Sequence, residues 1–190
     1  IQKFTLGGSY ISKVGSYGSG DNQFFYPNTV RYHDGKIYIS DEGNIKIKIF
    51  STDLTYIDYI SVFYNPSGLY IDDANDQIIV GTYHHLSVYD LQTKTTLRIS
   101  SSIPLGGSPV QVGNYVFRGD LENHKIRKYL YSDLSFLDEY TPGQGSLPGQ
   151  LNTPRHLNFW PEKNLILIAN EYPPYYVVGI TPELQFQSNP

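Results

Sequence analysis

The chain of 190 residues contains no cysteine and no methionine, and it has one tryptophan against 18 tyrosines. The absence of cysteine excludes disulfides, thiolate zinc sites and cysteine nucleophiles, but it does not assign a compartment. No apolar run approaches the roughly 18 residues that a membrane helix needs, so we expect no membrane insertion. Because even position 1 is not methionine, we expect a processed protein or a piece of a longer one.

Positive charge is also too scarce for a general nucleic-acid surface. Lys and Arg number 14 against 18 Asp and Glu, for a formal charge of -4, whereas phosphate binding requires clustered positive charge. The basic residues that alternate with apolar ones are Lys46, Lys48, Lys125, Arg127 and Lys128. This alternation is typical of strands whose polar side chains face water. We therefore do not expect nucleic acid as a partner.

What the sequence does contain is a repeated unit. Its four copies begin at prolines about 40 to 45 residues apart, namely Pro27, Pro66, Pro109 and Pro154. Each copy includes a short apolar segment bounded by turn-forming residues, at 36–40, 77–80, 114–117 and 164–169. Turns rich in Gly, Asn and Asp precede these segments, and helical periodicity is absent. The sequence predicts an all-β fold, a β-propeller with about four blades of four antiparallel strands.

Particular motifs resemble those of the NHL-repeat family. The first copy has Gly18-Ser-Gly-Asp-Asn-Gln-Phe24 ahead of its proline, and the fourth has Gly145-Ser-Leu-Pro-Gly-Gln-Leu151. The third copy carries Glu122-Asn-His-Lys-Ile126, similar to the Asn-His-basic-Ile run of the family. The second copy departs from the pattern, with Tyr83-His-His85 at the place of the Asn-His pair. The resemblance implies a propeller that serves as a binding scaffold.

We treat residues 1–190 as one propeller domain or part of one. Its units cover about 15–60, 61–100, 101–140 and 141–190. Residues 1–4 and 9–14 read as the third and fourth strands of a preceding blade, and we place the last third strand at 184–186. NHL propellers usually close with six blades, on the order of 250 residues. We therefore expect part of a larger ring, a compact ring, or self-association through unpaired blade edges.

The loops between second and third strands and the loops between blades should share one face. The candidate binding residues there are Asp41, Tyr83, His84, Asp120, Arg155, His156, Glu171, Tyr172 and Tyr175. The more frequent role of such carboxylates is to accept backbone N–H bonds in turns. Two prolines among tyrosines at 171–176 predict a stiff loop that suits recognition of a sugar, a peptide or another subunit. The competing interpretation is that these rings cover an adjacent blade.

No enzyme signature appears in the chain. HExxH, GxSxG, P-loop and EF-hand motifs are absent, and Gly106-Gly-Ser108 lacks the lysine and helix of a phosphate loop. We predict a non-catalytic scaffold that binds a protein or glycan through the loop face, without cofactor or metal. The sequence leaves the compartment open, and we favour an extracellular assembly.

Two alternative functions remain. His84, His124 and His156 could converge on a metal, as in the propeller lyases that amidate peptides, because imidazole is a common metal ligand. This would make the chain a metal-dependent lyase or hydrolase. In the main interpretation, His124 instead bonds or packs between blades. The second alternative is RNA binding, as in some animal NHL proteins, with an affinity that falls steeply with salt.

Overall fold

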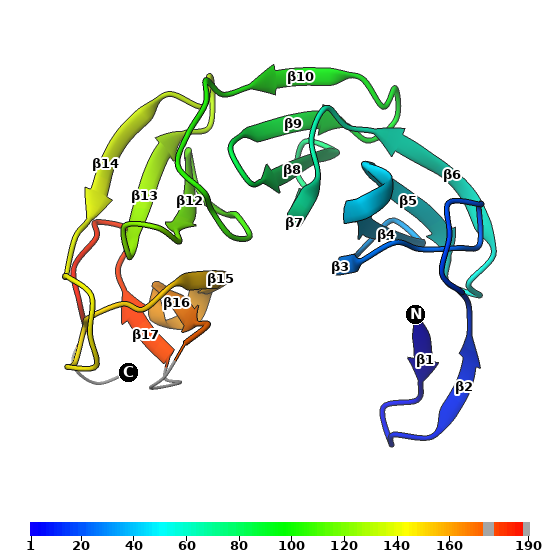
Figure 1. Cartoon of the computed structure of the whole chain (residues 1–190), viewed down its shortest axis with the longest axis horizontal. Helices are drawn as coiled ribbons and strands as arrows, with labels where there is room; N and C mark the ends of the chain where they lie inside the picture. Colours follow the sequence, from blue (N-terminus) through cyan, green and yellow to red (C-terminus); the bar gives the residue numbers. More distant parts are fainter. Residues whose placement is uncertain (173–176, 188–190) are drawn as a thin grey trace. The chain divides into compact units, whose positions relative to one another are not determined.

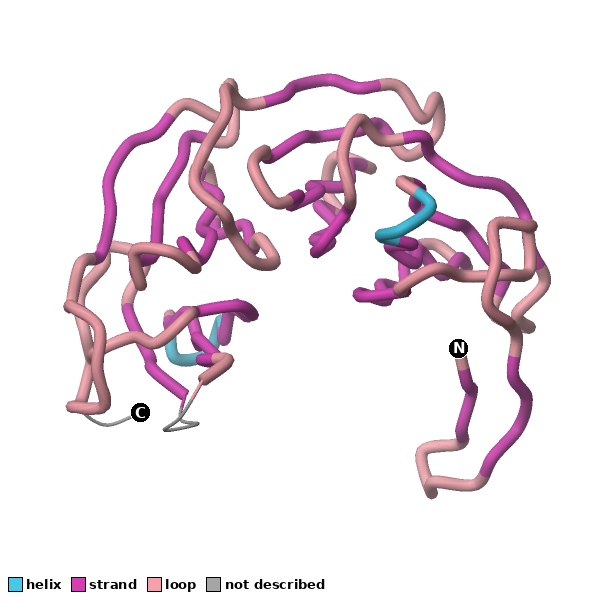
Figure 2. The backbone as a smooth tube through the Cα atoms, viewed as in Figure 1, coloured by secondary structure: helices cyan, strands magenta, loops and turns pink. Residues whose placement is uncertain are grey.

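A computed structural model describes residues 1–172 and 177–187. The chain divides into two compact units, Ile1–Ser67 and Gly68–Pro190. Apart from strands, the described part contains two short 3-10 turns, η1 (Glu42–Asn44) and η2 (Pro161–Lys163), drawn in cyan in Figure 2. No helix in these ranges is long and apolar enough to cross a membrane.

The first unit contains a hairpin and a four-stranded antiparallel sheet (Figure 1). The hairpin pairs β1 (Gln2–Phe4) with β2 (Tyr10–Lys13). The sheet has the order β3-β4-β5-β6, with bounds Pro27–His33, Lys36–Asp41, Lys46–Ser51 and Tyr56–Ser61. Antiparallel neighbours joined by short turns agree with the predicted blade, and the hairpin confirms the strands predicted at 1–4 and 9–14.

The second unit contains three sheets. One of them includes β7, whose first two residues precede the boundary of the unit. The first has the order β10-β9-β8-β7, with bounds Thr96–Ile99, Leu86–Asp90, Gln77–Thr82 and Pro66–Asp72. The second has the order β11-β12-β13-β14, with bounds Val110–Val112, Tyr115–Asp120, Lys125–Leu130 and Phe136–Tyr140. The third contains β15 (Pro154–Trp160), β16 (Leu165–Asn170) and β17 (Val177–Ile180).

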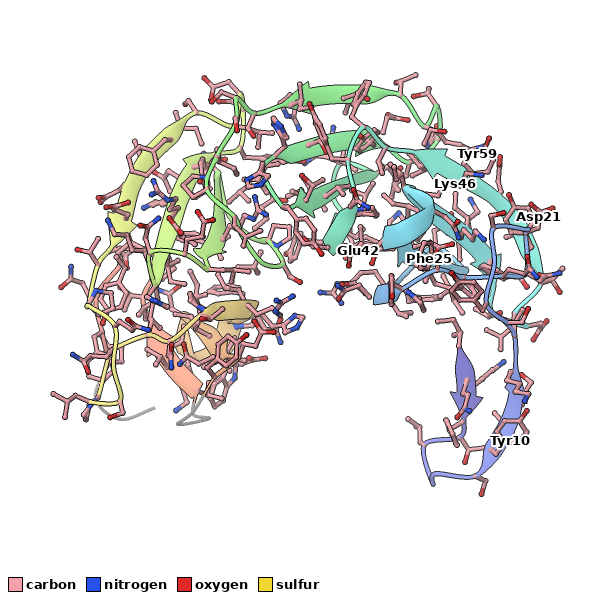
Figure 3. All side chains as sticks on the ribbon, in the orientation of Figure 1. Tyr10, Asp21, Phe25, Glu42, Lys46 and Tyr59 are labelled. Atoms are coloured by element: carbon pink, nitrogen blue, oxygen red, sulfur yellow. The ribbon has the colours of Figure 1, made fainter. Side chains whose placement is uncertain are left out.

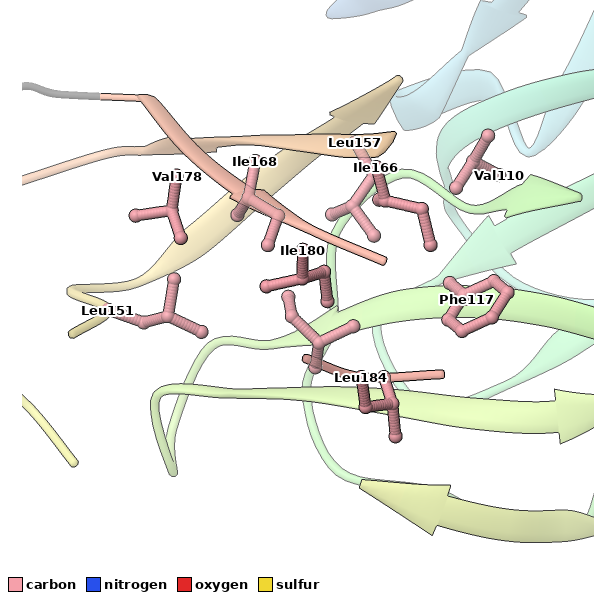
Figure 4. Packing of buried hydrophobic residues seen from close by; sticks show 10 residues of the cluster. Val110, Phe117, Leu151, Leu157, Ile166, Ile168, Val178, Ile180 and Leu184 are labelled. Carbon is pink, nitrogen blue, oxygen red and sulfur yellow. The ribbon is translucent and has the colours of Figure 1, made fainter. Parts of the chain in front are cut away.

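Burial follows the position of each strand within its sheet. The second strands β4, β8 and β12 are buried over most of their length, because both of their faces are covered. The fourth strands β6, β10 and β14 are mostly exposed. In the second unit, Phe117, Ile166 and Ile180 belong to a core cluster contributed by the third and fourth copies (Figure 4). The chain is therefore all-β, with the four-stranded antiparallel blades of a β-propeller.

The turns between third and fourth strands share one design. In the first unit, Ser51 N–H donates to Thr55 O at 2.8 Å, with Leu54 at φ 63°. In the second unit, Thr181 N–H donates to Gln185 O at 2.9 Å, with Leu184 also at φ 63°. The prediction of a third strand at 184–186 was therefore wrong. Leu184 and Gln185 belong to the turn after β17, with Leu184 in the left-handed conformation, and Phe186 then pairs with Ile180 of β17 in an antiparallel bridge.

Candidate functional site

The loop after the second strand contains a buried polar network in the first copy. The carboxylate of Asp41 accepts a hydrogen bond from Phe25 N–H at 2.7 Å and from the Asn44 amide at 2.7 Å. The ammonium of Lys48 lies 3.2 Å from the same carboxylate. Burial of both charges is compatible with folding because each is paired and hydrogen-bonded.

The third copy repeats this network. The Asp120 carboxylate accepts bonds from Asn123 N–H at 3.0 Å and from its amide at 3.0 and 3.1 Å. The Arg127 Nε donates to the same group at 2.8 Å. An acid, an amide three positions later and a cation seven positions later thus form one motif. Both acids accept turn N–H groups, the role expected of such carboxylates, while ligand binding by Asp41 and Asp120 stays a prediction.

The side chain of Lys48 differs from the expectation that the alternating basic residues face water. Its side chain does not face water, since only 2% of it is exposed. Its ammonium donates to Gly20 O at 2.6 Å and also to Gln23 O. Strand alternation could not reveal this, because the loop that covers Lys48 comes from residues about 25 positions earlier in the chain. Lys48 therefore anchors the first lead-in loop, which we define as residues 15–26.

The first lead-in loop and its counterpart, the fourth lead-in loop (residues 142–153), share their backbone bonds. Gln23 N–H donates to Gly20 O at 2.9 Å, as Gln150 N–H does to Leu147 O at 3.0 Å. Phe25 N–H donates to Asp41 at 2.7 Å, as Asn152 N–H does to Asn170 at 2.8 Å. A Cβ at Gly18 would lie 2.2 Å from the Gln23 amide oxygen, so glycine permits this fold-back of the glutamine. The two loops therefore have one geometry.

Three aromatic residues, Tyr17, Phe25 and Tyr26, distinguish the first loop. The rings of Tyr17 and Phe25 meet edge to face at 5.2 Å, and those of Phe25 and Tyr26 stack at 4.7 Å. We call these three residues the aromatic patch. Tyr17 is 77% exposed and Tyr26 70% exposed. The corresponding positions in the fourth loop are polar, Gln144, Asn152 and Thr153.

The aromatic patch lies next to the loop after β4. This position agrees with the prediction that the loops between blades and the loops after second strands share one face. Gly43 N–H donates to Phe25 O at 2.7 Å, and Glu42 N–H donates to Tyr26 O at 3.2 Å. Figure 3 shows Phe25 beside Glu42. The predicted binding residues do not include this patch, although the difference between positions 17, 25 and 26 and their counterparts in the fourth copy is visible in the sequence. Within the first unit, the two kinds of loop therefore share one face.

The second unit brings together two of the predicted site residues, Arg155 and Glu171. Arg155 Nε lies 2.9 Å from the Glu171 carboxylate, and both side chains are about one-third exposed. His156 is exposed, and its Nδ1 lies 3.3 Å from the Ser108 hydroxyl. Tyr172 follows Glu171 and is 55% exposed, whereas Tyr175 lies outside the described residues. Arg155 and Glu171 thus form an ion pair next in sequence to an exposed tyrosine, whereas His156 contacts Ser108.

Tyr83 and His84 occupy the tight turn between β8 and β9. Tyr83 is 41% exposed and His84 is also exposed. Their backbone is fixed, because Gly106 N–H donates to Tyr83 O at 3.1 Å and Ile103 N–H to His84 O at 2.9 Å. This turn therefore presents two side chains on a rigid backbone.

A buried arginine that the sequence analysis missed holds this turn. Arg118 is 1% exposed, and its guanidinium donates to backbone oxygens of Thr82, His85, Gly106 and Gly107. Burial lowers the pKa of Arg118 to about 10, so it remains a cation at neutral pH. Its only sequence signal is a basic residue inside the apolar strand β12. Arg118 therefore connects the turn after β8 to the loop before β11.

The structure places His124 where the main interpretation requires it. Its Nδ1 accepts a hydrogen bond from Thr153 N–H at 3.0 Å, which joins the third copy to the fourth lead-in loop. The prediction that His124 bonds between blades is therefore confirmed. In residues 1–172 and 177–187, no group of three or more His, Cys, Asp or Glu side chains could hold a metal ion.

Comparisons with known proteins identify the fold but no family. No family model matches the chain, and no curated protein matches its sequence. A functionally unknown protein from Desulfotomaculum acetoxidans is similar in structure, with a TM-score of 0.72 and 14% identity, over 98% of this chain and 62% of that one. Hydrazine synthase from Kuenenia stuttgartiensis gives a TM-score of 0.68 and 12% identity, over 87% of this chain and 49% of that one.

A designed protein is also similar. The computationally designed Ika4 protein gives a TM-score of 0.62 and 13% identity, over 89% of this chain and 98% of that one. The chain thus spans only about half to three-fifths of the two natural proteins. Identities of 12 to 14% establish the propeller-like fold and carry no statement about activity.

Proposed function

We propose that the chain is an NHL-like, non-catalytic scaffold that binds a protein or a glycan through its loop face. The aromatic patch is the principal contact on the first unit. On the second unit, Tyr172, His156 and the Arg155–Glu171 pair are the candidate contacts. The proposal is based on the residues of the candidate site and not on the fold, because propellers as a class host many unrelated functions.

One observation carries the proposal, the contrast between the two lead-in loops. Gln144, Asn152 and Thr153 permit the same backbone bonds as Tyr17, Phe25 and Tyr26. The aromatic side chains are therefore not needed to build the loop. Contiguous exposed apolar surface is characteristic of interaction sites, and tyrosine provides contact area at low entropic cost. A binding role accounts for rings that folding does not require.

The NHL part of the proposal is supported by the motif residues themselves. Asn123 and His124 both make bonds that fix the blade, to Asp120 and to Thr153. The glycine-rich lead-in has the same bonds in the first and fourth copies. These contacts give a physical role to Asn123, to His124 and to the fold of the glycine-rich lead-in.

The experiment replaces the aromatic patch with the residues of the fourth copy. The wild-type chain and the variant Tyr17→Gln/Phe25→Asn/Tyr26→Thr are applied to a glycan array and to a peptide array. We expect at least about tenfold weaker binding of the strongest ligand, since buried aromatic anchors dominate interface energies. The control is Tyr10→Gln, which removes another exposed aromatic, on β2.

Retained affinity in the triple variant would overturn the role of the aromatic patch. Loss of affinity together with a lower urea midpoint would assign these rings to folding and would also contradict the proposal. A loss of affinity with an unchanged midpoint, absent in Tyr10→Gln, supports it. Tyr172→Ala measures the contribution of the second unit in the same assay.

A further inference from the structure

A second feature of the first unit is an open pocket of about 670 Å³ whose lining includes none of the three residues of the aromatic patch. Three segments line it: the end of β2 (12–15), the tip of the first lead-in loop (21–22) and the turn between β5 and β6 (53–56). We call it the rim pocket. In Figure 3, Asp21 lies beside β6 and apart from Phe25. The volume falls within the range of small-molecule sites.

The walls of the rim pocket are held in place by the chain itself. Lys3 connects the hairpin to the β5–β6 turn, because its Nζ donates to Thr52 O at 2.8 Å and lies 3.7 Å from the Asp53 carboxylate. The Ser51 hydroxyl accepts bonds from Asp53 N–H at 3.3 Å and Thr55 N–H at 3.2 Å. Leu54, only 8% exposed, anchors the turn in the unit. The pocket is therefore preformed.

In the fourth copy, a direct contact joins the positions that correspond to two lining residues of the rim pocket. There, Tyr140 OH donates to Gly149 O at 2.9 Å, and the Phe186 ring approaches the same glycine, about 3.0 Å from where a Cβ would be. Lys13 and Asn22 stand at the corresponding positions of Tyr140 and Gly149 in the first copy. Where the fourth copy has this contact, the first copy thus has two polar side chains.

The chemistry of the lining indicates the class of ligand. In the lining, Asp21 and Asp53 offer acceptors and Lys13 offers a donor. The side chains of Ser12, Asn22 and Thr55 and the hydroxyl of Tyr56 offer both. The lining contains two acids and one lysine, Lys13, and Asp53 is also paired with Lys3, which lies outside the lining, so the charges around the pocket are close to balanced. Val14, Leu54 and the Tyr56 ring supply apolar surface.

We propose that the rim pocket binds a neutral saccharide. Each sugar hydroxyl is both a donor and an acceptor, which matches a wall that carries both kinds of group. The apolar C–H face of a pyranose ring fits against the Tyr56 and Leu54 side. This inference deepens the proposed scaffold function by naming a ligand class, and it concerns residues that the aromatic patch does not include.

Isothermal titration with free maltose, cellobiose, mannobiose and chitobiose tests the proposal. We expect one disaccharide to bind the wild-type chain, and Asp21→Ala to weaken it about 5- to 20-fold through loss of an acceptor for sugar hydroxyls. Tyr56→Phe keeps the ring and should weaken binding less, by about 3- to 10-fold. Asp34→Ala is the matched control, because Asp34 is an exposed acid in the β3–β4 turn.

The outcomes separate this pocket from the loop face. Absence of binding by all four sugars at millimolar concentration would overturn the proposal, as would binding that Asp21→Ala leaves unchanged. Tighter binding of glucuronic acid than of glucose would contradict a neutral ligand. The aromatic-patch variant should bind the disaccharide with the affinity of the wild type. A negative result for the rim pocket therefore leaves the proposed role of the aromatic patch standing, and the reverse also holds.

Discussion

The ammonium of Lys48 lies 3.2 Å from the carboxylate of Asp41, and both side chains are almost fully buried. Lys48 also donates to the backbone of the first lead-in loop, at Gly20 and Gln23. One ion pair therefore fixes both the loop after β4 and the loop that carries the aromatic patch. This coupling explains how exposed rings can stand on a rigid backbone.

Lys48→Met tests this anchor. The substitution leaves the Asp41 carboxylate buried without its cation, which should cost about 3 to 5 kcal/mol of the free energy of unfolding. The double variant Asp41→Asn/Lys48→Met removes both charges and should recover part of that loss. Urea unfolding measures all three chains. Equal stability of wild type and Lys48→Met would show that the pair does not hold the loop.

Arg118 gives a second prediction for stability. Arg118→Met removes the guanidinium that donates to three buried carbonyl oxygens, those of Thr82, Gly106 and Gly107, each bond worth about 1 kcal/mol, so we expect a loss of about 3 kcal/mol. Arg118→Lys keeps the charge but lacks the planar guanidinium. Its free energy of unfolding should therefore lie between those of the wild type and Arg118→Met. Urea unfolding provides the measurement. A Lys variant as unstable as the Met variant would mean that charge contributes nothing.

Stability should fall as pH rises above about 10. Burial raises the pKa of Tyr131, and hydrogen bonding to Asp72 and the charge of Asp72 raise it further. An unfolded tyrosine ionises near pH 10, whereas the folded one keeps its proton, so the unfolded state binds fewer protons in this range. Ionisation thus favours unfolding, and stability decreases with pH.

The variant Tyr131→Phe isolates this effect, because phenylalanine ionises in neither state. Its urea midpoint should decline less steeply than that of the wild type between pH 9 and pH 11. Tyr10→Phe, at an exposed position, serves as the control. Identical slopes for the wild type and Tyr131→Phe would refute the assignment.

Local sequence signals predicted the blades well, because the structure of a blade is itself local. The segment 36–40 lies within β4 and 77–80 within β8, since apolar runs between turn residues leave the chain few other choices. The last third strand was misplaced because Leu184 looks apolar in sequence but occupies a turn. Local pattern thus predicts strands better than their ends.

The candidate site was less predictable because it depends on contacts between distant segments. Nothing near Lys48 or Arg118 in sequence indicates that a loop covers either cation. Tyr17 and Phe25 become neighbours only when the lead-in loop folds back on itself. The useful signal was the difference between copies at matched positions, rather than the motif that the copies share.

Hydrogen–deuterium exchange tests the central claim most directly, with the wild-type chain free and saturated with its strongest array ligand. If the ligand binds the loop face of the first unit, amides of residues 16–26 and 42–45 should exchange more slowly in the complex. Protection confined to the outer strands β6, β10 and β14, with no change in these two loops, would contradict the account.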